Sequence, residues 1–220
     1  MIVNTTTDYF TLRASLARTG SEGTQERPIP ANVRIYDVAG ASHALVQAAE
    51  CNLPVGVLDW HPVMRATLLD LDHWVASNTE PPPSHLMPLE ERPNDPMILP
   101  APIYLAKAKI QVPVRDQDGN AVGGVRLPDI SAPLDTYGGQ NSPSTFLCSL
   151  VASYVPFAKT REERDAAKDS RPSLADRYKD RNDYVNHIRI TARELTSAGL
   201  LLHQDAAIIV NAAAEVRSFK

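Results

Sequence analysis

The sequence predicts an α/β fold, and three observations lead to this class. Two short apolar runs, residues 1–3 and 33–38, have the composition of strands, and each leads into a polar turn. Residues 61–77 follow with the apolar spacing of an amphipathic helix. The last part of the chain, residues 146–220, contains several helical patterns. Strands that alternate with helices are typical of α/β proteins with a parallel sheet.

The composition is that of a globular protein and argues against several classes of function. Hydrophobic residues make up 43% of the 220 residues, which is enough for a sizeable core. The net charge of −4 gives no basic surface, so we expect no nucleic-acid partner. No apolar run approaches the ~18 residues of a membrane span. The sequence indicates no compartment, because Cys51 and Cys148 are compatible with two free thiols or with one disulfide.

The first of three expected zones, residues 1–78, holds both strands and the helix. Pro62 suits the first turn of that helix, since its missing N–H has no intrahelical partner there. We expect the helix to bury one face, formed by apolar residues three and four positions apart: Met64, Leu68, Leu71, Trp74 and Val75.

The second zone, residues 79–145, is rich in proline and glycine and contains one hairpin candidate. Residues 107–112 and 124–127 flank a strong turn signal at Asp118, Gly119 and Asn120. The acidic residues from Asp116 onward also resemble half of a calcium loop. However, the glycine and glutamate that such a loop needs at its sixth and twelfth positions are absent, so a turn is the favoured interpretation.

The third zone, residues 146–220, predicts a helical C-terminal extension. Residues 184–198 and 205–216 have the pattern of two amphipathic helices, and Gly199 fits the position just after a helix end. Upstream, Thr160 and Ser173 each stand three residues before an acidic side chain, a weak capping-box pattern.

Asp8 and His43 are the candidate catalytic residues. Each follows one of the two predicted strands, and parallel neighbouring strands would bring both turns to the same edge of the sheet. An acid followed along the chain by a histidine matches the last two members of a Ser–acid–His triad. A serine should precede both, yet only seven residues precede Asp8. We therefore expect that this chain carries only part of a hydrolase site.

Ser42 offers an alternative nucleophile. Residues 40–44 read Gly-Ala-Ser-His-Ala, which resembles a nucleophile elbow placed between a strand and a short helical stretch at 45–50. Ser42 would then need a later acid and a later histidine, for which His187 or His203 could serve. No series of parallel strands follows to carry them, so His43 as the base is favoured, with a purely structural His43 as the other alternative.

The sequence contains no pattern for a cofactor or a metal ion. The other histidines lack the i, i+4 pairing that two zinc ligands on one helix need, and no glycine-rich phosphate loop is present. We therefore expect no cofactor and no metal. These histidines are His61, His73, His85, His187 and His203.

Several motifs in fixed order resemble those of a known family over nearly the whole chain. They are residues 5–9, 32–36 with 39–43, 68–74 followed by 81–84, 118–128, 156–157, 171–174 with 177–178, and 201–202 with 205–206. Together they look like the C-terminal third of the alpha/beta hydrolase domain-containing proteins. The resemblance implies the C-terminal part of an α/β-hydrolase sheet, followed by a Pro-rich β-hairpin segment and the helical extension.

The resemblance also implies site residues and a substrate class. The family's histidine after a Gly-x-x-His turn maps onto His43, and the acid after the preceding strand maps onto Asp8. The implied chemistry is hydrolysis of a small-molecule ester-like substrate by a serine in an N-terminal hydrolase segment, which lies outside this chain. We thus expect a fragment that is inactive alone and self-associates through an unpaired sheet edge. The alternatives are a non-catalytic binding or remnant module, and a small hydrolase that uses Ser42.

Overall fold

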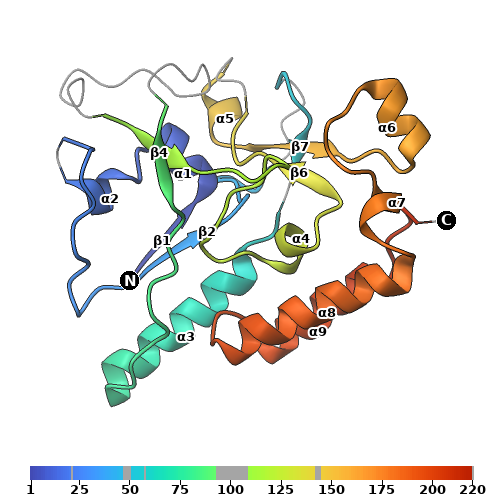
Figure 1. The fold of residues 1–220 in the computed structure, drawn as a ribbon. Coiled ribbons are helices and arrows are strands. Elements are labelled where there is room, and N and C mark those ends of the chain that lie inside the picture. Colours follow the sequence, from blue (N-terminus) through green and yellow to red (C-terminus); the bar gives the residue numbers. More distant parts are fainter. Residues whose placement is uncertain (21, 47–50, 57, 93–108, 142–144, 220) are drawn as a thin grey trace. The chain divides into compact units, whose positions relative to one another are not determined.

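The computed structural model describes residues 1–20, 22–46, 51–56, 58–92, 109–141 and 145–219. The chain forms two compact units that alternate along the sequence (Figure 1). Unit 1 consists of residues 1–59, 83–125 and 137–155, and unit 2 of residues 60–82, 126–136 and 156–220.

Unit 1 is built around a parallel pair of strands. Strand β1 (Ile2–Thr5) pairs with β2 (Ile35–Val38) in a register that places Ile2 beside Ile35 and Thr5 beside Val38. The other edge of β2 makes parallel bridges, from Tyr36 to His85 and from Val38 to Val125. The expected parallel neighbours are therefore confirmed.

Short elements surround this pair. In unit 1 they are the helices α1 (Thr6–Thr11), α2 (Leu16–Thr19) and α5 (Phe146–Ser149), with the strands β3 (Val55–Gly56), β4 (Leu89–Glu91), β5 (Gln111–Pro113) and β7 (Ala152–Pro156). Strand β6 (Asp135–Tyr137) completes a sheet of order β3-β7-β6.

The expected hairpin has its turn in the right place but a different strand partner. The Asp116 carboxylate accepts the backbone N–H groups of Asp118 at 3.0 Å and Asn120 at 2.9 Å, which forms the predicted turn. Strand β5 pairs antiparallel with β4, and Val125 bridges to β2 instead of to β5. Periodicity within the two segments could not reveal these partners, because both lie far away in the sequence. Residues 107 and 108 lie outside the described residues.

Asp37 of β2 forms a buried ion pair with Arg18. The Asp37 carboxylate is fully buried and accepts hydrogen bonds from Arg18 Nη1 at 3.3 Å, Met87 N at 3.0 Å and Asn4 Nδ2 at 3.1 Å. Burial raises the pKa of Asp37, while these hydrogen bonds and the Arg18 charge oppose the rise. The Arg18 side chain is itself almost fully buried, so each charge depends on its partner.

Replacing Arg18 with methionine is expected to lower the free energy of unfolding by about 3 kcal/mol, because it leaves the Asp37 carboxylate buried without its cation. The loss should be larger at pH 8 than at pH 5. Without Arg18 the pKa of Asp37 rises further in the folded state, so stability falls as pH rises above the unfolded value. Urea unfolding at both pH values measures this. A double variant with Asp37→Asn that loses as much as the two single losses together would contradict the coupling.

Unit 2 is helical. Its helices are α3 (His61–Ser77), α4 (Pro128–Ser131), α6 (Arg161–Ala167), α7 (Leu174–Arg177), α8 (Arg181–Ser197) and α9 (His203–Ala214). α8 packs against α9 and α4 around a buried cluster that includes Tyr184 and Ile188 (Figure 1). The guanidinium of Arg65 on α3 forms an ion pair with the buried carboxylate of Asp205 on α9, at 2.6 Å. Gly199 follows the end of α8 with φ +77°, as expected of a C′ glycine.

The helix α3 has the expected bounds, but the expected face is only partly buried: Met64, Leu71 and Trp74 are half-buried, and the fully buried residues lie elsewhere. Leu68 is 57% exposed and Val75 is 81% exposed, whereas Val63, Ala66 and Thr67 are buried. The two faces both show spacings of three and four residues, so periodicity could not choose between them. The buried face carries smaller side chains, which allow close packing.

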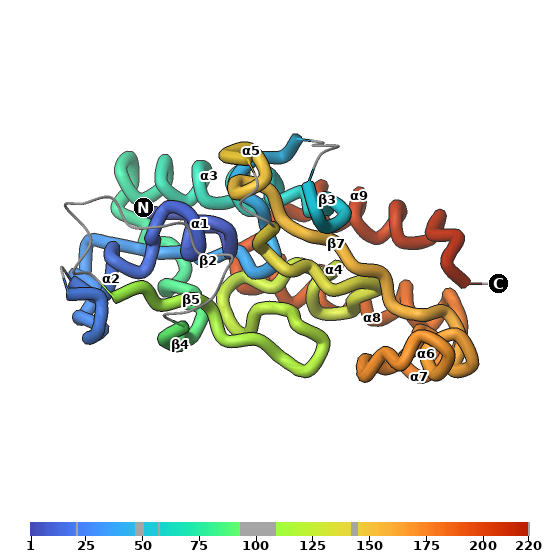
Figure 2. The backbone as a smooth tube through the Cα atoms, turned by 90° about the horizontal axis from the view of Figure 1, so that it is seen from above, coloured from blue at the N-terminus to red at the C-terminus, as the bar shows by residue number. Residues whose placement is uncertain are grey.

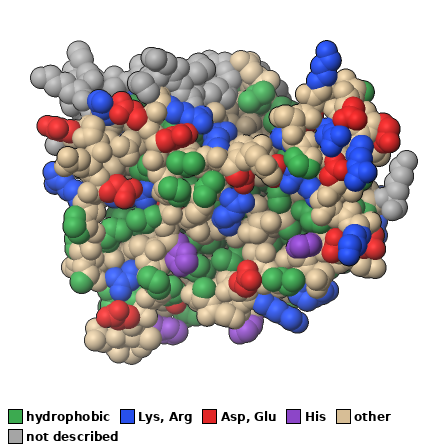
Figure 3. Space-filling view, viewed as in Figure 1, with side chains coloured by type: hydrophobic (Ala, Val, Ile, Leu, Met, Phe, Trp, Pro, Cys, Tyr) green, Lys and Arg blue, Asp and Glu red, His purple; other side chains and the backbone are tan. Residues whose placement is uncertain are grey.

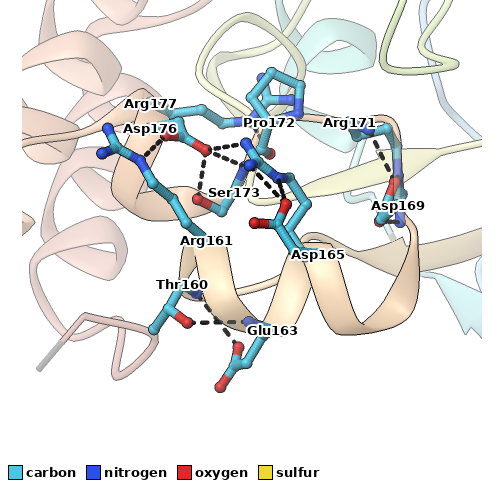
Figure 4. A network of polar contacts seen from close by, with 11 residues as sticks. Thr160, Arg161, Glu163, Asp165, Asp169, Arg171, Pro172, Ser173, Asp176 and Arg177 are labelled. Atoms are coloured by element: carbon cyan, nitrogen blue, oxygen red, sulfur yellow. Dashed lines mark hydrogen bonds and ion pairs between the residues drawn. The ribbon is translucent and has the colours of Figure 1, made fainter.

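The helices α6 and α7 are joined by the polar network of Figure 4. The Asp176 carboxylate accepts hydrogen bonds from Ser173 Oγ at 2.7 Å and Arg164 Nη1 at 2.9 Å, and it also pairs with Arg161. The predicted capping boxes at Thr160 and Ser173 are both present. These hydrogen bonds, first of all the one from Ser173, hold the pKa of Asp176 below its usual range.

Candidate active site

Asp8 lies in the first turn of α1, immediately after β1. Its carboxylate is mostly buried, and the Oδ2 atom accepts the backbone N–H of Thr5 at 2.6 Å. An acid at this helix position satisfies an N–H that the helix leaves without an intrahelical partner. One carboxylate oxygen is thereby held by the backbone, and Oδ1 is left to face another group.

His43 follows the turn after β2. Gly40 in this turn has φ +71°, a conformation that favours glycine, and its N–H donates to Thr6 Oγ1 at 2.8 Å. The turn is thus attached to α1. The imidazole Nδ1 of His43 lies 2.7 Å from Asp8 Oδ1, so the expected proximity of the two side chains is confirmed.

The geometry orients the imidazole ring. Because Nδ1 faces the carboxylate, it donates its hydrogen there, and Nε2 is the nitrogen that is available to take a proton from a nucleophile. Within the described residues Nε2 has no hydrogen-bond partner, and the His43 side chain is 44% exposed. This arrangement is chemically competent for general base catalysis, with an acid that orients the base.

Helix α5, which lies beside α1 in both Figure 1 and Figure 2, links the segments that carry Asp8 and His43. The Thr11 hydroxyl at the end of α1 donates to the carbonyl of Ser149, and Ala44 N donates to the carbonyl of Leu150 at 2.9 Å. Cys51 forms a disulfide with Cys148 of α5, which decides between the two alternatives that the cysteine spacing left open. Asp8 and His43 therefore lie on segments that α5 holds from both sides.

Ser42 does not stand on a nucleophile elbow. Its side chain is fully buried, and its hydroxyl donates to the carbonyl of Ala44 at 2.9 Å. An elbow needs a helix directly after the serine, whereas residues 41–46 form no helix. The rest of the expected helical stretch, residues 47–50, lies outside the described residues.

In the described part of the chain, no group of three or more His, Cys, Asp or Glu side chains could hold a metal ion. Among the same residues, no helix is long and apolar enough to cross a membrane. Basic and acidic side chains are interspersed on the face shown in Figure 3.

Sequence reasoning missed two features of the site. The hydrogen bond from the Thr5 N–H to Asp8 could have been predicted, because a threonine three residues before an acid is a capping pattern. The role of α5 has no such signal, since its contacts join residues more than 90 positions apart.

The chain was compared with known proteins. Residues 1–211 match the model of a family described as alpha/beta hydrolase domain. No curated protein and no solved structure matches. Since the match covers nearly the whole chain, this protein belongs to the alpha/beta hydrolase domain family.

Proposed function

We propose that Asp8 and His43 are the acid and the base of a serine hydrolase that transfers the acyl group of an ester to water. The observation that carries the proposal is the contact of 2.7 Å between His43 Nδ1 and Asp8 Oδ1, with the other carboxylate oxygen held by Thr5. Membership of an α/β-hydrolase family supports it. The nucleophile in this proposal is a serine outside residues 1–220, because Ser42 is buried and lacks an elbow.

In this mechanism the serine Oγ attacks the ester carbonyl while its proton moves to His43 Nε2. His43 then gives that proton to the leaving alcohol as the C–O bond breaks, which forms an acyl-enzyme. Water repeats the sequence: its oxygen attacks the acyl carbon, its proton passes through His43 to the serine, and the free acid leaves. Asp8 stabilises the imidazolium in both steps and is not itself protonated.

The pairing of β1 supports the proposal that a second polypeptide segment completes the site. Among the described residues, β1 pairs only with β2, so its other edge offers backbone groups to a further strand. We propose that the nucleophile-bearing segment adds a strand here. In its absence the same edge would promote self-association of the chain.

The purified 220-residue chain is expected to hydrolyse p-nitrophenyl butyrate no faster than a buffer blank, since the proposal places the nucleophile outside these residues. Ser42→Ala should change nothing. The polypeptide encoded directly upstream, if it carries a Gly-x-Ser-x-Gly elbow, should restore hydrolysis when the two are combined. His43→Ala should then abolish it. Activity of the chain alone that Ser42→Ala removes would instead support a small independent hydrolase. Failure of the combined pair would support a non-catalytic module.

A further inference from the structure

The described part of unit 1 exposes five large apolar side chains, and all of them lie on the segments that carry or hold the acid–histidine pair. Leu12 directly follows α1, Val46 and Leu53 follow His43 along the chain, and the other two are on α5. We call this set the apolar patch: Leu12, Val46, Leu53, Phe146 and Leu147.

The contacts of α5 bring these segments together. Thr11, next to Leu12, donates to the carbonyl of Ser149. Ala44, between His43 and Val46, donates to the carbonyl of Leu150 at 2.9 Å. The disulfide from Cys51 to Cys148 adds a covalent link two residues before Leu53.

The helix α5 exposes its large apolar side chains and buries its small ones. Phe146 is 69% exposed, whereas Cys148 and Ser149 are buried. The side chain that would gain most from burial is held in solvent, while small side chains occupy the interior. The helix is fixed in this orientation by the disulfide and by Thr145, whose hydroxyl accepts the N–H of Cys148 at 3.1 Å. A group of apolar side chains held outward on neighbouring segments is a candidate binding surface.

We propose that the apolar patch binds the aliphatic acyl chain of the ester, so that the substrates are esters of medium-chain, unbranched acids. This inference rests on the proposed function. A carbonyl that reacts with a nucleophile activated by His43 must lie within a few ångströms of that ring. The acyl chain next to the carbonyl then reaches the neighbouring segments, three of which carry the exposed apolar side chains of the patch. A chain of methylene groups gains from such a surface, whereas a short or charged acyl group does not.

Binding by the isolated chain tests this without catalysis. Octanoate and butyrate carry the same charge and differ only in chain length, so each can be titrated against the ¹⁵N-labelled protein by NMR. We expect octanoate to bind on the order of tenfold more tightly, since each of its four additional methylenes is only partly buried on an open surface and adds about a twofold gain, less than the ~fourfold of full burial. It should shift the amides of α5 and the ring protons of His43. Phe146→Asn combined with Leu147→Asn should reduce octanoate binding to the level of butyrate.

The matched control is Leu68→Asn combined with Val75→Asn, which removes equally exposed apolar side chains from α3 of the other unit. This control should leave octanoate binding unchanged. Shifts on α3 as large as those on α5, or binding that survives the α5 double variant, would overturn the proposal. Light scattering tests a further outcome. If the unmodified chain is an oligomer, the α5 double variant is a monomer and octanoate does not dissociate the oligomer, the patch binds a second copy of the chain and the proposal is overturned.

The proposed function and the acyl-chain inference can be tested separately. In the enzyme completed by its nucleophile, the α5 double variant should lower the ratio of kcat/KM for p-nitrophenyl octanoate over butyrate about tenfold, while His43→Ala should abolish both activities. If octanoate binds at α5 but His43→Ala keeps its activity, only the catalytic assignment fails. If His43→Ala abolishes activity but the ratio does not change in the α5 double variant, only the acyl-chain inference fails.

Discussion

Asp8→Asn is expected to lower kcat for ester hydrolysis by roughly 10⁴-fold in the completed enzyme, the size of loss that the same change causes in a serine protease triad. The physical reason lies in the N–H of Thr5, which donates to one oxygen of Asp8. An asparagine has a single oxygen, and that oxygen will keep the bond to Thr5. Its NH₂ group then faces His43 Nδ1 and forces the imidazole hydrogen onto Nε2, the atom that must accept a proton.

Two measurements separate this effect from unfolding. In the isolated chain, the far-downfield ¹H NMR signal of a hydrogen-bonded His43 Nδ1–H should be present in the unmodified protein and absent from the variant. The midpoint of urea unfolding should change little, because the bond to Thr5 is retained. Asp72→Asn on the exposed part of α3 is the matched control and should leave both activity and the NMR signal unchanged. Full activity of Asp8→Asn would remove Asp8 from the proposed site.

Removing the disulfide by Cys51→Ala and Cys148→Ala is expected to destabilise unit 1 by about 4–5 kcal/mol. The bond joins residues 97 positions apart, and in the chain-entropy model closing a loop of this size restricts the unfolded state by that amount. The two cysteines are both in unit 1, whereas both tryptophans, Trp60 and Trp74, are in unit 2. The two units can therefore be followed by different signals.

Hydrogen exchange of the β1 and β2 amides should report the loss in unit 1, and tryptophan fluorescence during urea unfolding should report unit 2. A dithiol reductant added to the unmodified protein should reproduce the loss, and the double variant should not respond to it. Equal exchange rates with and without the disulfide would show that the bond adds nothing to the stability of unit 1.

Much of the local structure of this protein could be predicted from its sequence. Helix α3 has the predicted bounds, the turn at Asp116 is present, and Gly199 ends α8 as expected. These features depend on neighbouring residues, on caps and on backbone conformation, so a short window contains the information. The acid–histidine proximity was also predictable, because the two parallel strands determine where the following turns meet.

Features that depend on distant partners were not predictable. Strand β5 could pair with either of two segments, and only the packed structure selects β4. The face of α3 around Leu68 has the right spacing for burial, yet the face around Ala66 is the one that packs. The outward orientation of Phe146 contradicts its hydrophobicity, and it is imposed by a disulfide whose pairing the spacing did not decide. Functional surfaces are where local preferences are most often overridden.

The distance between the two cysteines has a consequence for biosynthesis. Ribosomes add ~5–20 residues per second, so the Cys51 thiol waits on the order of 5–20 s before Cys148 is made. During this interval the segment after His43 has neither its covalent link nor the Leu150 carbonyl, directly after α5, that accepts the Ala44 N–H. Unit 1 also needs residues up to Val155, so it can complete its fold only late in translation. The disulfide that fixes the segment after His43 can therefore form only after most of the chain has been made.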